Sequence, residues 1–125
     1  MACEVEFTDE FADWWDHLTA EEQASVRASV KLLEELGVSL KYPYCSGIER
    51  SNYDHMRELR VQHAGRPYRV LYAFDPRRKA ILLIGGDKTG EDRWYDTFVP
   101  LADKFYGRHL EMLRKEGNSY GAQIQ

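Results

Sequence analysis

The sequence predicts an α+β domain in which two N-terminal helices and a C-terminal helix accompany a small twisted antiparallel sheet. Two observations lead to this fold class. Apolar residues recur at helical spacing in the first third of the chain, and they alternate with polar residues in consecutive segments between residues 56 and 86. Short turns join those segments, which is typical of an antiparallel meander.

The N-terminal third is expected to hold a short strand and two helices. Residues 3–7, CEVEF, alternate as a strand does, and a helix capped by Thr8 follows. Thr19 and Glu22 then have the spacing of a capping box, in which a hydroxyl and a carboxylate satisfy free amides at a helix start. Apolar residues recur with helical spacing until Gly37 ends the second helix.

The remainder of the chain is expected to form a loop, a sheet and a last helix. Residues 38–53 contain Pro and Gly and predict the loop. The predicted strands are residues 56–63, 67–74 and 80–86. The helix begins at Trp94 and ends near Lys115, with an apolar stripe of Phe98, Leu101, Phe105 and Met112. Residues 4–115 would then be a single domain, followed by a flexible C-terminal tail, residues 116–125.

Composition excludes several classes of protein. No apolar run reaches the roughly 20 residues that cross a bilayer, and the first residues lack the basic and apolar regions of a signal peptide. Cys3 and Cys45 have neither the spacing of a zinc site nor that of a disulfide framework. We therefore expect a cytoplasmic protein with no membrane partner and no structural metal.

Charge is distributed unevenly along the chain. The net charge of -4 is unlike that of a nucleic-acid-binding domain, whose pI is often above about 9. However, residues 1–36 carry ten acidic residues against two basic ones, whereas residues 55–80 carry seven basic residues against two acidic ones. Such segregation indicates a basic working face on the predicted sheet.

The most patterned part of the chain carries the motifs of a known family. The segments MRELR, GRPYRVLYAF and AILLIGGDKTGEDRWYDTFVPLADKFYGRHL follow one another in this order. They resemble the RelE/ParE superfamily of toxins, and within it the HigB-like, phage-derived branch. The resemblance covers residues 4–113. It implies a RelE-like fold and a type II toxin–antitoxin system, with mRNA cleaved on the ribosome without metal or cofactor and silenced by a cognate helix-turn-helix antitoxin.

The resemblance also suggests catalytic residues. RNA cleavage without a metal needs a base for the 2′-OH and cations for the charge that builds on the phosphate. Arg69 matches an arginine that contacts the phosphate in RelE-type toxins; the alternative is an exposed strand arginine paired with a carboxylate such as Glu58. Lys88 falls where the family places basic residues. Tyr95 is the expected base-stacking ring, and for the competing Trp94 we favour core packing.

The general base stays open in the sequence. The lysine-rich strand of RelE is replaced here by Met-Arg-Glu, so His63 and His55 become candidates, because histidine titrates near neutral pH. Arg57 and Arg60 have opposite parity on their strand, so only one can face the active side. The expected RNA-binding residues are Arg57, Arg60, Arg66 and Arg93.

A second hypothesis is a protein of the same fold that binds without catalysis, such as an inhibitor of gyrase or a phage factor for host takeover. Asp87 departs from the more basic pattern of HigB-like proteins, and an acid among phosphate contacts weakens RNA affinity. The GGDKTG segment lacks the spacing of a phosphate loop, which excludes a nucleoside triphosphatase. The length of a translated message separates the two hypotheses, because only a ribonuclease shortens it.

Overall fold

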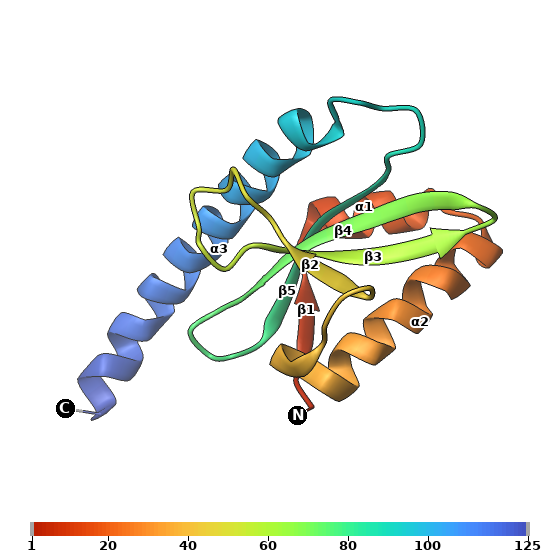
Figure 1. Cartoon of the computed structure of the whole chain (residues 1–125). Coiled ribbons are helices and arrows are strands. Elements are labelled where there is room, and N and C mark those ends of the chain that lie inside the picture. The colour runs from red at the N-terminus through yellow and green to blue at the C-terminus, as the bar shows by residue number, and fades with distance from the viewer. Residues whose placement is uncertain (1, 125) are drawn as a thin grey trace.

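The computed structural model of the chain describes the backbone of residues 2–124 and the side chains of residues 2–117. Its elements, in chain order, are β1 (Val5–Phe7), α1 (Asp9–Asp16), α2 (Ala20–Leu36), a 3-10 turn (Gly37–Ser39), β2 (Cys45–Gly47), β3 (Arg57–His63), β4 (Arg66–Phe74), β5 (Ala80–Asp87) and α3 (Trp94–Ile124) (Figure 1). The predicted α+β class is confirmed. Within the described residues, no helix combines the length and apolar character needed to cross a membrane.

A single five-stranded sheet has the order β1-β5-β4-β3-β2. The meander of β3, β4 and β5 is antiparallel and has the predicted bounds to within a residue. Two short strands depart from the prediction. β1 pairs in parallel with β5, so the sheet is mostly rather than wholly antiparallel. β2 lies inside the segment predicted as a loop and pairs antiparallel with β3. Three residues are too few for alternation to identify such a strand.

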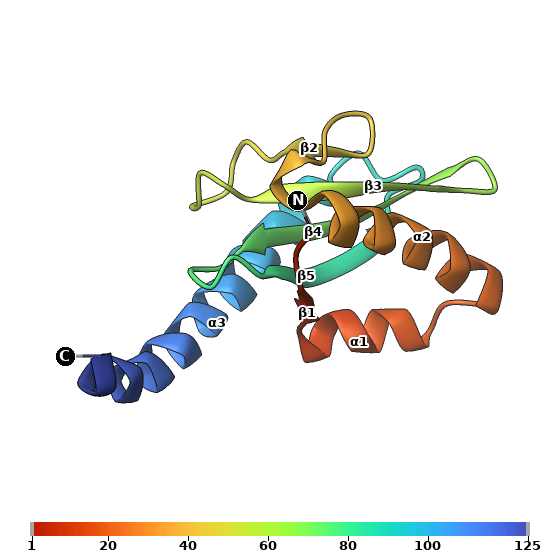
Figure 2. The same cartoon turned by 90° about the horizontal axis from the view of Figure 1, so that it is seen from below.

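The two N-terminal helices begin as predicted. Thr8 Oγ1 accepts a hydrogen bond from the Phe11 amide at 3.0 Å. Thr19 and Glu22 form the reciprocal capping box, with distances of 3.1 and 2.8 Å. Both helices lie against the same face of the sheet (Figure 2), over a core that includes Val26 and Leu33 of α2. A second core, on the other face, lies beneath α3.

Two successive glycines of β5 let helices approach both faces of the sheet. A Cβ atom built on Gly85 would lie 2.3 Å from the Trp14 ring of α1, and one built on Gly86 would lie 2.8 Å from Trp94 Nε1 of α3. Successive residues of a strand point to opposite faces, so this pair leaves room for one tryptophan on each side. The burial of Trp94 confirms the core role that the sequence favoured.

α3 differs from its prediction in length and in its buried stripe. The helix continues past Lys115 to Ile124, beyond the edge of the sheet (Figure 1). Among the residues of α3 whose side chains are described, the buried ones are Trp94, Val99, Ala102, Asp103, Phe105, Tyr106 and His109. Of the predicted stripe only Phe105 is among them, and Met112 is exposed because the helix has left the sheet by that point. The flexibility of the C-terminal tail stays a prediction.

Candidate active site

Two arginines lie opposite each other on neighbouring strands. Arg60 of β3 and Arg69 of β4 are register partners. They share the face that α3 covers, because Leu71, two residues beyond Arg69, packs in the core beneath that helix. Arg69 is only 4% exposed, so the exposed strand arginine assumed from the sequence is wrong. Arg57 faces the other side, which confirms that Arg57 and Arg60 cannot share a face.

Glu58 lies between the two guanidinium groups. Its Oε1 is 3.3 Å from Arg69 Nε, and its Oε2 is 3.6 Å from Arg60 Nη1. The hydroxyl of Tyr95 donates to Oε1 at 2.6 Å, and the hydroxyl of Ser46 donates to Oε2 at 2.6 Å. The ion pair that the sequence offered as the alternative for Arg69 is therefore present. One carboxylate facing two guanidinium groups leaves an excess of positive charge, which favours a further anion.

Arg69 has hydrogen-bonding capacity in reserve. Its Nη1 donates to the Tyr68 carbonyl at 3.0 Å, whereas its buried Nε makes no hydrogen bond of good geometry with any described residue. A guanidinium carries five N–H donors in a planar fork that matches the oxygens of a phosphate. Because Nε also lies 3.3 Å from Glu58 Oε1, this carboxylate compensates the charge of Arg69 in the free protein, and an arriving anion would compete with it for the guanidinium.

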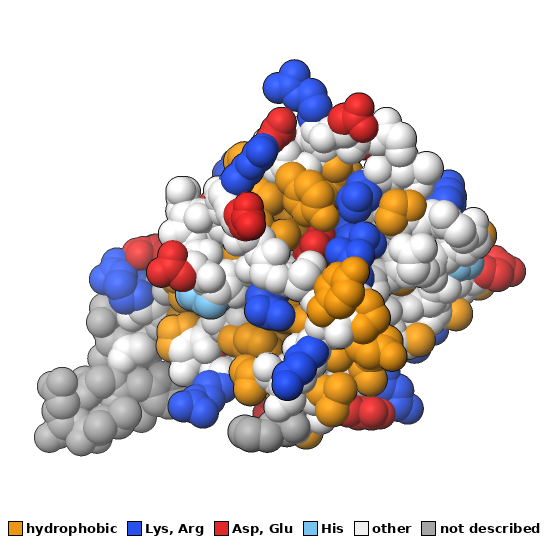
Figure 3. Space-filling model, viewed as in Figure 1, with side chains coloured by type: hydrophobic (Ala, Val, Ile, Leu, Met, Phe, Trp, Pro, Cys, Tyr) orange, Lys and Arg blue, Asp and Glu red, His pale blue; other side chains and the backbone are white. Residues whose placement is uncertain are grey.

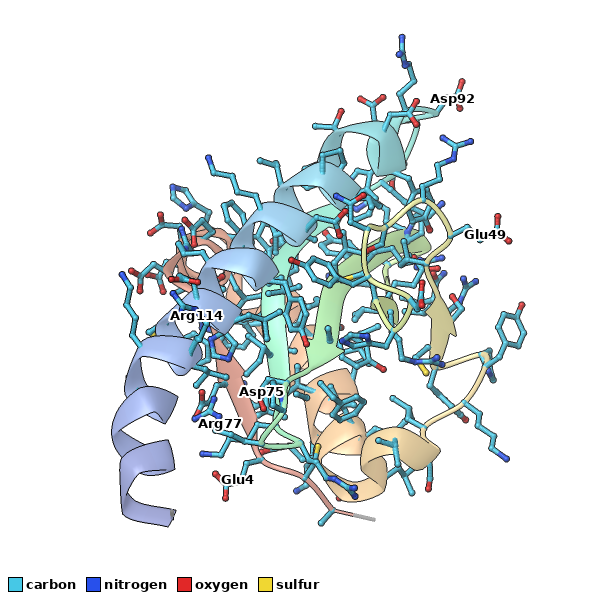
Figure 4. The ribbon with its side chains drawn as sticks, turned by 90° about the vertical axis from the view of Figure 1, so that its left-hand side faces the viewer. Glu4, Glu49, Asp75, Arg77, Asp92 and Arg114 are labelled. Carbon is cyan, nitrogen blue, oxygen red and sulfur yellow. The ribbon has the colours of Figure 1, made fainter. Side chains whose placement is uncertain are left out.

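A hollow of ≈ 360 Å³ opens beside this cluster and has Glu58 and Tyr95 in its wall. It lies between the loop after β2, which contributes Glu49, and the segment that leads into α3, which contributes Asp92 (Figure 4). Figure 3 shows the same face, where Lys and Arg side chains gather beside hydrophobic ones. The hollow makes the cluster reachable from solvent although Glu58 and Arg69 are themselves buried.

Tyr95 and Lys88 approach the cluster from the start of α3 and the end of β5. The Nζ of Lys88 is 5.6 Å from the centre of the Tyr95 ring, within the range of a cation–π contact. Burial, reinforced by the Glu58 carboxylate, raises the pKa of Tyr95 to about 12. Tyr95 is therefore a protonated hydrogen-bond donor at neutral pH.

The other predicted site residues lie outside this cluster. Arg57 donates to Cys45 Sγ at 3.2 Å, and Nδ1 of His63 contacts the Ser25 hydroxyl of α2 at 2.8 Å. Arg66 forms ion pairs with Glu22 and with Asp87, at 3.4 and 3.2 Å. The exposed Arg93 pairs with Asp96, and His55 contacts the hydroxyl of Tyr106.

Some basic residues of the segment 55–80 make structural contacts instead. The buried Asp75 carboxylate accepts hydrogen bonds from Arg77 and lies 2.9 Å from Nε2 of His109 on α3. Arg77 also pairs with Glu6 of β1 at 2.7 Å. Asp75 and Arg77 lie at the opposite end of the sheet from Asp92 (Figure 4). The charge segregation seen in the sequence therefore supplies two separate clusters.

Sequence reasoning missed two members of the site. Glu58 was considered only as a partner for Arg69, although its strand parity with Arg60 shows that the two share a face. Ser46 went unnoticed because it lies on the unpredicted β2, where it is the register partner of Glu58. Among the described residues, no three His, Cys, Asp or Glu side chains gather as metal ligands would.

Comparisons with known proteins show what this chain is similar to. The family model described as "Phage derived protein Gp49-like (DUF891)" matches residues 13–107. A Mycobacterium tuberculosis protein named "Putative toxin HigB3" is 45% identical over 92 residues, which cover 73% of this chain and 79% of that protein. A second, "Putative toxin HigB2", is 38% identical over 99 residues, covering 78% of this chain and 49% of that protein.

A solved structure shares the fold. It is a mutant of the E. coli toxin RelE in the free state, with a TM-score of 0.57 and 10% identity, and the match covers 78% of this chain and 96% of that one. The HigB-like assignment made from the strand motifs is confirmed. The chain belongs to the Gp49-like, phage-derived family of toxins and has the RelE fold.

Proposed function

We propose that this chain is the toxin of a type II toxin–antitoxin module and that it cleaves mRNA on the ribosome without a metal ion. The observation that carries the proposal is the Arg60–Arg69 pair around the Glu58 carboxylate, beside an open hollow. Membership of a toxin family and the names of the relatives support the first part. The chemistry of the cluster supports the second.

The cluster has a group for each step of RNA cleavage. The 2′-oxygen attacks the adjacent phosphorus while Glu58 takes the proton of the 2′-OH. Arg69 and Arg60 stabilise the charge that builds on the phosphate oxygens. The bond from phosphorus to the 5′-oxygen breaks, and the Tyr95 hydroxyl gives its proton to that oxygen. The products are a 2′,3′-cyclic phosphate and a 5′-hydroxyl.

The hydrogen bond between Tyr95 and Glu58 lets both groups return to their starting protonation states. After cleavage Glu58 holds a proton and Tyr95 has lost one. Their oxygens are 2.6 Å apart in the free protein, so the proton passes from the carboxyl to the phenolate along an existing hydrogen bond. A phenol whose pKa is raised to about 12 recovers its proton readily, because its ionised form is disfavoured.

The contacts of the other predicted residues support a role in RNA binding to different degrees. Lys88 adds positive charge next to Tyr95, and the exposed Arg93 near the hollow is suited to contact the RNA backbone. Arg57 and His63 lie on the α2 side of the sheet, and their contacts favour structural roles. Arg66 is held by two acids, so Asp87 has a cationic partner of its own.

Partners follow from the proposed activity. We infer that a cognate helix-turn-helix antitoxin binds the toxin, that the ribosome presents the mRNA, and that the protein acts in the cytoplasm. A net charge of -4 supports the ribosomal part, because an acidic chain gains little from non-specific attraction to RNA. Ribosomal RNA and proteins would add to the affinity that the toxin's own cluster provides.

Message length after induction tests the proposal. Wild type, Glu58→Gln and the control Glu35→Gln, an exposed position on α2, are expressed at equal levels with a translated reporter. We expect shortened messages from the wild type and the control and full-length messages from Glu58→Gln. Growth arrest with intact messages would overturn the ribonuclease, and accompanying DNA damage would favour a gyrase inhibitor.

A further inference from the structure

An exposed aromatic ring lies beside the candidate active site and has no part in the cluster described above. Tyr42, in the turn before β2, is 72% exposed. The guanidinium carbon of Arg60 is 5.1 Å from the centre of its ring. A solvated tyrosine contributes little to folding, so its position next to a site arginine calls for another explanation.

The turn that carries Tyr42 is fixed to the site by its backbone. The amide of Arg60 donates to the carbonyl of Tyr44 at 2.9 Å. Within the turn, the amides of Tyr44 and Cys45 donate to the carbonyl of Lys41 at 3.0 and 3.3 Å. The ring is therefore presented at a defined place relative to Arg60, although its side chain is solvated.

Arg60 joins this ring to the phosphate cluster. One end of its guanidinium is 3.6 Å from Glu58, and the group as a whole lies over the Tyr42 ring. Its register partner is Arg69. A nucleotide whose phosphate contacts Arg69 and Arg60 would therefore bring a neighbouring base to the edge of Tyr42.

We propose that Tyr42 is a stacking platform for an RNA base next to the scissile phosphate, an inference that rests on the proposed function. Single-stranded nucleic acids bind where aromatic rings alternate with cationic groups, because each base presents a π-face and each phosphate a charge. Tyr42 and Arg60 supply one of each. The exposed Lys41 adds a further cation in the same turn.

A platform of this kind selects for single strands but not for sequence. Stacking depends on ring faces, which every base has, whereas hydrogen bonds to base edges would discriminate among bases. A protein partner that covered the Tyr42 ring would be a poorer fit. The arginine beside this solvated ring favours a ligand that carries negative charge. Single-stranded RNA is thus the occupant to which the contacts point.

Binding of a short single-stranded RNA, methylated on every 2′-oxygen so that it cannot be cleaved, tests the platform directly. Its fluorescence anisotropy is measured with wild type, Tyr42→Leu, Tyr42→Phe and the control Tyr44→Leu, a neighbouring tyrosine that is 54% exposed. We expect Tyr42→Leu to weaken binding about tenfold to a hundredfold. Tyr42→Phe should stay within about twofold because it keeps the ring face.

Two further readouts separate the platform from the rest of the site. The salt dependence of binding should be unchanged in Tyr42→Leu, because no phosphate contact is lost, whereas Arg60→Gln should reduce it. In cleavage assays Tyr42→Leu should raise KM and leave kcat nearly unchanged, as expected when a ground-state contact is removed.

The outcomes distinguish this inference from the proposed function. Wild-type affinity in Tyr42→Leu, equal losses in Tyr42→Leu and Tyr44→Leu, or no binding by the wild type would each overturn the platform. A wild type that binds the methylated RNA through Tyr42 but never cleaves an unmodified one would leave the platform standing and remove the ribonuclease. Thermal melting of each variant verifies that the fold is intact.

Discussion

Glu58 pairs with both arginines of the candidate site in the free protein. Its carboxylate compensates Arg69 and Arg60 in the free protein, and in the proposed reaction it must give up those contacts to the phosphate. A buried carboxylate near two cations ordinarily stabilises the fold. The same group that holds the site together thus competes with the substrate, so removing its charge should have opposite effects on binding and on catalysis.

The first prediction follows from this competition. Glu58→Gln should bind uncleavable RNA more tightly than the wild type, while its cleavage rate should fall by about two to four orders of magnitude for loss of the general base. Its unfolding free energy should fall by roughly 3 kcal/mol, because two arginines lose their partner. Anisotropy, cleavage kinetics and denaturant unfolding measure the three effects. Weaker RNA binding with undiminished cleavage would show that Glu58 is not the base.

The second prediction concerns Arg69. Arg69→Ala should lower the rate of cleavage by about two to three orders of magnitude, the usual effect of removing a donor that stabilises a transition state. Because Arg69 is buried, it should also lose about 1–3 kcal/mol of stability, with Glu58 keeping its other partners. Arg69→Lys should recover only part of the activity, since a point charge cannot bind two oxygens side by side.

Toxicity, thermal melting and message cleavage of the Arg69 variants are compared at equal expression. Lys88→Ala is the matched comparison and should lose less activity, because Lys88 contacts the Tyr95 ring rather than Glu58. Arg69→Ala with wild-type toxicity would remove Arg69 from the site.

At the level of single residues, the sequence predicted which residues would belong to the candidate site better than it predicted what each of them contacts. Arg69, Lys88 and Tyr95 were predicted from the family motif, and the structure brings all three to one end of the sheet. The site face of β4 and the burial of Arg69 depend on strand register, which local sequence does not encode. His63 shows the same limit, because nothing in its neighbourhood along the chain indicates contact with Ser25 on α2.

Two features attach the helices to the sheet: a pair of glycines in β5 and a buried carboxylate. Gly85 and Gly86 admit a tryptophan to each face of β5, and Asp75 ties α3 to the turn between β4 and β5. Long alternating strands and capped helices were predictable from sequence. β1 was predicted as a strand within residues 3–7, but its parallel pairing with β5 was not. β2 was missed, because a strand of three residues depends on its partner strand for its identity.

The third prediction tests the approach of α1. Gly85→Ala should destabilise the protein by about 1–3 kcal/mol, because the new methyl group would overlap the Trp14 ring. Gly47→Ala is the control, since a Cβ there meets no atom within 4 Å. Denaturant unfolding of both variants, followed by tryptophan fluorescence, gives the comparison. Equal stability of the two would show that Trp14 does not pack against β5.

The fourth prediction tests the attachment of α3. Burial raises the pKa of Asp75, but hydrogen bonds from His109 and Arg77 outweigh it and leave the pKa below its ordinary value. A carboxylate whose pKa is lowered by folding stabilises the protein above its unfolded pKa of about 3.9, and this contribution is lost as pH falls through the folded value. Asp75→Asn should therefore cost about 1.5–3 kcal/mol at neutral pH and progressively less in acid.

Glu111→Gln serves as the control for Asp75→Asn. Glu111 pairs with Arg114 on the exposed surface of the same helix, where solvent screens the pair, so its loss should leave the unfolding free energy nearly unchanged. Urea unfolding at neutral and acidic pH measures both variants. A cost for Asp75→Asn that is equally small, or that persists unchanged in acid, would contradict the role given to Asp75.

Across the whole molecule, two groups of basic residues lie at different ends of the sheet. Arg60 and Arg69 face Glu58, and Lys88 lies over the ring of Tyr95 at the start of α3. Arg77 lies at the opposite end from Asp92 (Figure 4), where it and Lys79 pair with acids. The acidic N-terminal third keeps the net charge negative. The positive charge is therefore local to the candidate site on a protein that is acidic as a whole, and the proposed function places the RNA at that site.

The chemical nature of the product ends, identified by mass spectrometry, tests the central claim most directly. The purified toxin is added to programmed ribosomes, and Arg69→Ala is run beside it. The proposed mechanism predicts that the wild type leaves 2′,3′-cyclic phosphate and 5′-hydroxyl ends, while folded Arg69→Ala cleaves at least about a hundredfold more slowly. Products bearing 3′-hydroxyl and 5′-phosphate ends, which attack by a metal-activated water would leave, would contradict it.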